Sequence, residues 1–109
     1  MDKQLLELEK QADDLRNEGK YDDAIAKLTE AIGIDPNFAR GHLGLSVLYH
    51  HAQDYEKSCF HGEKAVEIEP GDTFNLSALS VTYQRAFEGT RDPIYIQKAE
   101  EAMAKSRGM

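Results

Sequence analysis

Residues 42–49 read His-Leu-Gly-Leu-Ser-Val-Leu-Tyr, and residues 76–83 read Leu-Ser-Ala-Leu-Ser-Val-Thr-Tyr. The two segments lie 34 positions apart and share Leu, Ser, Val and Tyr at matching places. The same step relates several pairs outside them: Pro36 and Pro70, Tyr21 and Tyr55, Ala31 and Ala65, Ile34 and Ile68. This many matches in one register indicate a chain built from a repeated unit.

Within each unit the apolar positions have the spacing of two helices. Leu45, Leu48 and Tyr49 recur at helical intervals, and a break at residues 53–54 precedes a second helix that begins at Tyr55. Proline ends the unit, because it lacks an amide donor and disfavours helical geometry in the residue before it. We therefore predict six helices, over residues 2–17, 21–34, 37–52, 55–68, 72–87 and 92–107.

The third unit departs from this pattern between its two helices. Residues 87–92 replace the short turn of the earlier units, and Asp92-Pro93 has the form of an N-cap followed by proline at the first helical position. The sequence therefore predicts a third repeat with a longer inter-helix loop. We expect the last helix to turn polar residues outward, as a terminal repeat needs for solubility, and the chain to be complete.

Composition excludes several classes of protein. The 109 residues allow one small domain, and a net charge of −7 without a Lys/Arg run argues against nucleic acid as a partner. The sequence has no apolar stretch long enough to span a membrane, and acids among the first leucines do not fit a signal peptide. The single cysteine, Cys59, cannot form an internal disulfide, so we expect a cytoplasmic protein.

The residues at fixed places in the unit resemble the tetratricopeptide repeat (TPR) family. The family's Trp-x2-Leu-Gly-x2-Tyr element is matched by Leu76-x2-Leu79-Ser80-x2-Tyr83, by His42-x2-Leu45-Ser46-x2-Tyr49 and more weakly by Leu8-x2-Gln11-Ala12-x2-Leu15. Its Ala-x3-Phe element is matched by Ala24-x3-Leu28, Ser58-x3-Gly62 and Ala99-x3-Met103. The resemblance covers nearly the whole chain and implies an all-α fold. It implies one domain over residues 1–109, in which hairpins at about 5–38, 39–72 and 73–107 stack into a short right-handed solenoid.

The resemblance also implies a binding face, because in this family the first helix of each unit lines the inside of the solenoid. On the free face of these helices Leu43, Val47 and Val81 are apolar, with polar residues around them, as in peptide-recognition grooves. The alternative is that these side chains pack against the neighbouring unit. The predicted peptide-binding residues are Arg40, Leu43, Val47, His50, His51, Ser77, Val81, Gln84 and Arg85.

The best-known peptide mode of the family is a clamp of lysines and asparagines around a terminal carboxylate. No residue at the matching positions here has a basic or amide side chain, and two of them are acids that repel a carboxylate. These positions hold Glu9, Asp13, Gly44, Phe74 and Ala78. We therefore expect a less acidic protein or peptide partner, and not the carboxylate tail of a chaperone.

The sequence contains no pattern typical of catalysis, such as a Gly-rich phosphate loop or a nucleophile elbow. The four histidines lack i,i+4 spacing, and adjacent His50 and His51 diverge by about 100° on a helix, so no metal site is expected. Cys59 is expected to pack as a small apolar group. We therefore predict a non-catalytic adaptor or scaffold that uses no cofactor.

Two alternatives stay open. The first is self-assembly into a homodimer, because Leu5, Leu6 and Leu8 in the first helix have no preceding repeat to cover them. The second is an accessory subunit of an enzyme complex, which needs the same kind of binding surface as an adaptor. A fold of this kind indicates a class of function without identifying the partner.

Overall fold

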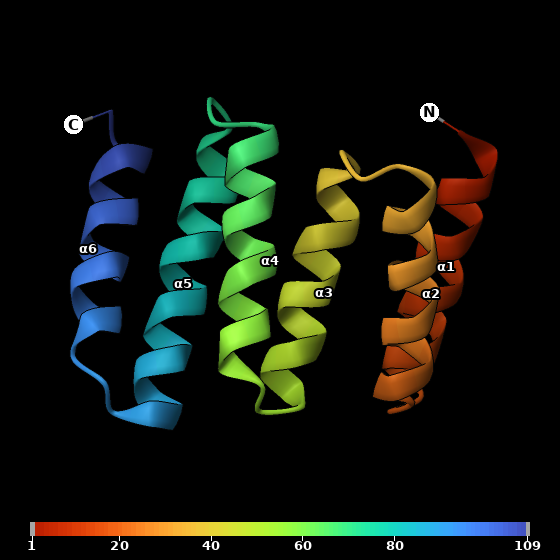
Figure 1. Ribbon diagram of the computed structural model, residues 1–109, viewed down its shortest axis with the longest axis horizontal. Coiled ribbons are helices and arrows are strands. Elements are labelled where there is room, and N and C mark those ends of the chain that lie inside the picture. The colour runs from red at the N-terminus through yellow and green to blue at the C-terminus, as the bar shows by residue number, and fades with distance from the viewer. Residues whose placement is uncertain (1, 109) are drawn as a thin grey trace.

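The computed structural model describes residues 2–108, which form six α-helices paired into three hairpins (Figure 1). The pairs are α1 (Lys3–Asn17) with α2 (Tyr21–Ile34), α3 (Ala39–His51) with α4 (Tyr55–Ile68), and α5 (Thr73–Thr90) with α6 (Ile94–Ser106). The hairpins follow one another in a row, so the two ends of the chain lie at opposite ends of the molecule (Figure 1). The six predicted helices are confirmed.

Aspartate side chains begin three of the helices. Asp2, Asp54 and Asp72 each accept a hydrogen bond from a backbone amide two or three residues further on, at 2.7, 3.2 and 2.9 Å. Each bond satisfies an amide that has no partner within its helix, and such a cap stabilises a helix by about 1 kcal/mol.

The turns inside the first two hairpins repeat with the sequence. Gly19 and Gln53 lie 34 positions apart, and both have positive φ, at 79° and 62°. In each turn the next amide bonds back over the end of the helix, from Lys20 to the Leu15 carbonyl and from Asp54 to the Tyr49 carbonyl, both at 2.9 Å. The turn closes through this backbone hydrogen bond and a positive φ, and it does not require glycine, because Gln53 adopts the same conformation as Gly19.

The prediction of a longer loop in the third hairpin is wrong. Its connection, residues 91–93, is as long as those at 18–20 and 52–54, and the additional residues extend α5 to Thr90. Arg91 closes the helix at φ 62°, the conformation that glycine often supplies. Gly89 breaks no helix; a Cβ at this position would overlap the ring of Tyr55, so glycine allows α5 to lie close to α4.

Small residues lie where the two helices of each hairpin cross. Ala12, Ser46 and Ser80 are all buried. The two serines also form buried hydrogen bonds: the Ser46 carbonyl accepts from the Ser58 hydroxyl at 2.7 Å, and the Ser80 hydroxyl donates to the Ala99 carbonyl at 3.0 Å. Larger side chains here would separate the helices.

The expected exposure of the first leucines is wrong for two of the three. Leu5 and Leu8 are buried in a cluster with Ala31 of α2 and with Phe38, the residue just before α3. Only Leu6 remains exposed, at 41%. A single exposed leucine is common on protein surfaces, so these residues give no support for self-assembly at this end.

Candidate functional site

The first helices of the hairpins, α1, α3 and α5, form an inner row. α3 packs against α5 as well as against α4 and α2. Polar side chains join the row: Arg40 on α3 donates to Glu9 on α1 at 2.9 Å, and the Ser46 and Thr82 hydroxyls of α3 and α5 lie 3.3 Å apart. These contacts place three helices from different repeats on one continuous face.

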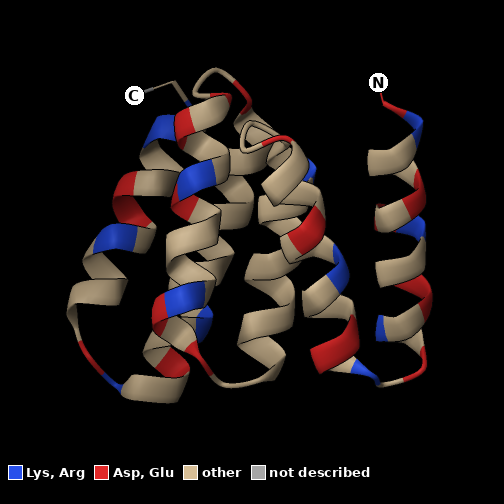
Figure 2. Cartoon of the chain, turned by 45° about the vertical axis from the view of Figure 1, so that its right-hand side comes forward, with Lys and Arg blue, Asp and Glu red and all other residues tan. Residues whose placement is uncertain are grey.

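Charge is unevenly distributed over this face. Figure 2 shows Lys, Arg, Asp and Glu along the whole of α1, at one edge of the molecule. α3 contains only Arg40 among these residue types, and α5 contains only Arg85 and Glu88. The part of the inner row formed by α3 and α5 is therefore mainly apolar or neutral.

The structure leaves the predicted binding residues accessible to different degrees. Leu43 and Val47, the apolar residues on α3, are half-buried, whereas Val81 on α5 is 40% exposed. Of the remaining predicted residues, His50 and Ser77 are half-buried, and Arg40, His51, Gln84 and Arg85 are exposed. Val81 is thus the most accessible apolar residue of the predicted set.

Two of the predicted residues are engaged by neighbours. The ion pair with Glu9 raises the pKa of Arg40, so the guanidinium is a link between α1 and α3. The ring of His51 stacks on Tyr21 of α2, with centroids 5.0 Å apart and planes within 5°. Both side chains stabilise the first contact between repeats, and a ligand would compete with these contacts.

His50 and Arg85 form a polar corner where the end of α3 lies beside α5. Burial lowers the pKa of His50 most, and the positive charge of nearby Arg85 lowers it further. The buried His50 Nδ1 has no hydrogen-bond partner within residues 2–108. The unused polar atom is thus enclosed by the protein, and Arg85 is the exposed polar group of this corner.

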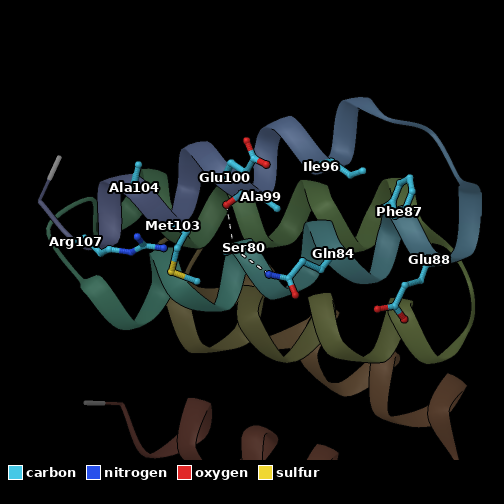
Figure 3. A pocket seen from close by; sticks show the side chains of 10 residues that line it. All are labelled: Ser80, Gln84, Phe87, Glu88, Ile96, Ala99, Glu100, Met103, Ala104 and Arg107. Atoms are coloured by element: carbon cyan, nitrogen blue, oxygen red, sulfur yellow. Dashed lines mark hydrogen bonds between the residues drawn. The ribbon is translucent and has the colours of Figure 1, made fainter.

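An apolar hollow lies elsewhere, between α5 and α6 at the end of the row (Figure 3). Its volume is about 770 Å³, and Gln84 is the only predicted residue in its wall. The last helix turns polar residues outward, as expected, but its outer surface also contains Ile94 and Ile96, which are 43% and 44% exposed. The wall consists of Ser80, Gln84, Phe87, Glu88, Ile96, Ala99, Glu100, Met103, Ala104 and Arg107.

Sequence reasoning also missed a histidine pair inside the second hairpin. His42 on α3 and His61 on α4 approach with their Nδ1 atoms 3.0 Å apart, and the His61 ring stacks on Tyr49. His42 Nε2 lies 3.0 Å from the Pro36 carbonyl, which can only accept, so this nitrogen carries a proton. The neutral pair then has one arrangement, in which His61 donates to His42.

Nothing in the described part of the chain gathers the ligands of a metal ion, since residues 2–108 contain no cluster of three or more His, Cys, Asp or Glu side chains that could hold one. None of its helices is long and apolar enough to cross a membrane.

Cys59 is buried against Leu79 and Tyr83, and burial raises the pKa of its thiol to about 11. This thiol has the packing role expected of it.

The sequence model for the TPR repeat matches residues 12–53, which extend from within α1 to the turn after α3. Residues 12–53 carry the TPR sequence pattern. The TPR fold extends beyond the matched residues: a solved structure titled as the first TPR of Spaghetti (RPAP3) bound to HSP90 peptide SRMEEVD is similar over 97% of this chain and 92% of that chain, with a TM-score of 0.66 and 18% identity. No curated protein sequence matches the chain.

As an all-α TPR solenoid, the chain has the architecture of a protein–protein interaction module.

The positions that match the family's carboxylate clamp have other roles here. Glu9 pairs with Arg40, and Gly44 faces Leu28 of α2 so closely that a Cβ would collide with it. Gly44 therefore lies in the contact between repeats. Phe74 is 69% exposed.

Proposed function

We propose that this TPR chain is a non-catalytic adaptor that holds a protein segment along the inner faces of α3 and α5. The observation that supports this most is Val81, an apolar side chain 40% exposed on a helix with only two charged residues. Half-buried Val47 lies beside the contact between Ser46 and Thr82 that joins the two helices. Together the valines provide the apolar floor that an extended or helical segment would bury.

The polar residues around this floor define the partner's chemistry. His50 lies at the end of α3 near Arg85 of α5, and Gln84 and Ser77 are also on α5. Hydrogen-bonding groups around apolar side chains favour a segment with one or two apolar anchors and neutral polar neighbours. We propose residues 1–109 as one cytoplasmic domain whose three repeats, at about 5–38, 39–72 and 73–107, present this face.

The proposed ligand differs from the peptide in the related structure, whose title names an HSP90 peptide. In this chain Glu9 and Asp13 on α1 place carboxylates where a peptide carboxylate would need cations, and the nearby Arg40 is paired with Glu9. We expect no measurable binding of SRMEEVD by isothermal titration calorimetry. Micromolar binding would replace the proposed ligand class with the carboxylate class.

The proposal is tested by affinity capture from the native extract with wild type and with the variant Val47→Glu/Val81→Glu. A matched control, Ile34→Glu/Phe60→Glu, adds the same charge at two exposed residues of the outer helices α2 and α4. Circular dichroism establishes that both variants are folded. We expect wild type and control to retain a protein that the inner-face variant loses, and an enzyme in that fraction would identify the chain as an accessory subunit. Equal capture by all three would contradict the proposed face.

A further inference from the structure

The α5–α6 hollow corresponds to a face that is covered in the other two hairpins. In the first, Leu28 of α2 reaches Gly44 of α3; in the second, Leu79 of α5 reaches Gly62 of α4. Met103 on α6 stands at the matching place of the third hairpin, and within residues 2–108 no helix covers it. Exposed Ile96 and half-buried Phe87 and Met103 make this face apolar.

The charges at the two ends of the hollow are opposite. Its centre is the crossing of the helices, where the Ser80 hydroxyl donates to the Ala99 carbonyl at 3.0 Å. Glu88 lies eight residues beyond Ser80, and Arg107 lies eight residues beyond Ala99. Because α5 and α6 are antiparallel, the two residues lie at opposite ends of the hollow, about 12 Å from its centre along each helix (Figure 3).

We propose that this face pairs with the same face of a second copy of the chain. The two copies are related by a two-fold axis that lies in the interface and runs across the helices at the Ser80–Ala99 crossing. Such a rotation exchanges the ends of the hollow, so Arg107 of each copy meets Glu88 of the other. It also places Ile96 of one copy near Met103 of the other, since these residues lie on opposite sides of Ala99. The four helices then bury both apolar faces in one bundle.

A second copy fits better than an unrelated helix, because the surface is complementary to itself. An unrelated partner would need the opposite charges placed at the same separation, whereas a two-fold axis supplies them without further coincidence. Glu100 opposes the pairing, because near the axis it faces its own copy. The pairing shares only Gln84 with the proposed inner face of α3 and α5 and predicts a dimer that presents two such faces.

The test is a mixing experiment on the full chain, in which mass is measured by sedimentation equilibrium across a dilution series that reaches about 0.5 mM. Glu88→Arg gives the hollow positive charge at both ends, and Arg107→Glu gives it negative charge at both ends. Each variant alone should dimerise at least about tenfold more weakly than wild type, because like charges then meet twice across the axis. An equimolar mixture should recover the wild-type dimer, because opposite charges then meet at both ends.

Recovery of the dimer in the mixture distinguishes weakened pairing between copies from misfolding. A variant that failed to fold would not be rescued by mixing it with the other variant. The control pair, Glu30→Arg on α2 and Lys10→Glu on α1, carries the same charge changes at exposed positions away from the hollow. Both controls should dimerise as wild type does. Met103→Glu should abolish the dimer, and Glu100→Gln should tighten it. A monomeric wild type at the highest concentration, or a mixture no more associated than its components, would overturn the proposal.

Discussion

The Nδ1 atoms of His42 and His61 lie 3.0 Å apart across the second hairpin, between α3 and α4. The pair is held by its surroundings: His42 donates from Nε2 to the Pro36 carbonyl, and the edge of Phe60 meets the His61 ring, with centroids 5.0 Å apart. Burial, the neighbouring His42 and the cation of Lys57 lower the pKa of His61 to about 4. The second hairpin thus contains an imidazole that stays neutral at physiological pH.

Acid should destabilise the protein through this pair. The folded pKa of His61 is about 4 and its ordinary value is 6.5, so between these pH values the unfolded chain binds more protons than the folded chain. The free energy of unfolding therefore falls as the pH drops from 6.5 to 4. Urea denaturation followed by circular dichroism at intervals across this window measures the effect.

The matched variant is His61→Gln, which keeps a donor for His42 and has no titrating group. Its stability should depend less on pH than that of wild type across the same window. Some dependence should remain, because the pKa of His50 is also lowered. Parallel curves for wild type and variant would show that His61 does not carry the dependence.

Two glycine substitutions should have opposite effects on stability. Gly89→Ala on α5 places a Cβ in the ring of Tyr55, and overpacking of this kind typically costs about 1–3 kcal/mol. Gly33→Ala on α2 places a Cβ in open space, where alanine stabilises a helix by about 0.5–1 kcal/mol relative to glycine. Denaturant midpoints of the two variants measure the contrast. A stabilised Gly89→Ala variant would contradict the close approach of α4 and α5.

Cys59 should be unreactive in the folded protein. Its pKa of about 11 against an ordinary 9.0 reduces the thiolate fraction at neutral pH by about 100-fold, and burial limits access further. The rate of reaction with a thiol-specific disulfide reagent should therefore be at least about 100-fold lower in buffer than in denaturant. Equal rates in both conditions would show that the cluster around Leu79 and Tyr83 opens readily.

The 34-residue step was enough to predict the six helices, because their positions follow from local spacing. The end of α5 was not predictable in this way. Gly89 and Thr90 are typical of a turn, yet the Thr90 hydroxyl bonds back to the Ala86 carbonyl at 2.8 Å, and Tyr55 packs against the glycine. The sequence at Gly89 and Thr90 thus predicts the end of the helix, but contact with the preceding helix α4 keeps these residues in α5.

The functional surface was predictable only in outline. The resemblance to the TPR family identified the inner helices, but the pairing of Arg40 with Glu9 joins residues 31 positions apart, and the His42–His61 contact joins different helices. The apolar hollow on α5 and α6 forms because Ile96 and Met103 lie near Phe87. The sequence did not predict this hollow, because we expected a polar outer face on the last helix. Such features depend on the packing angle of each hairpin, which a repeat spacing does not determine.

The central claim, that the inner face of α5 holds the partner, is tested most directly by site-specific photo-crosslinking in the native extract. A photoreactive phenylalanine analogue replaces Val81 on the inner face in one protein and Phe60, which is 47% exposed on the outer helix α4, in another. We predict a crosslinked partner from position 81 that is absent from position 60. A partner crosslinked from position 60 and not from position 81 would contradict the account.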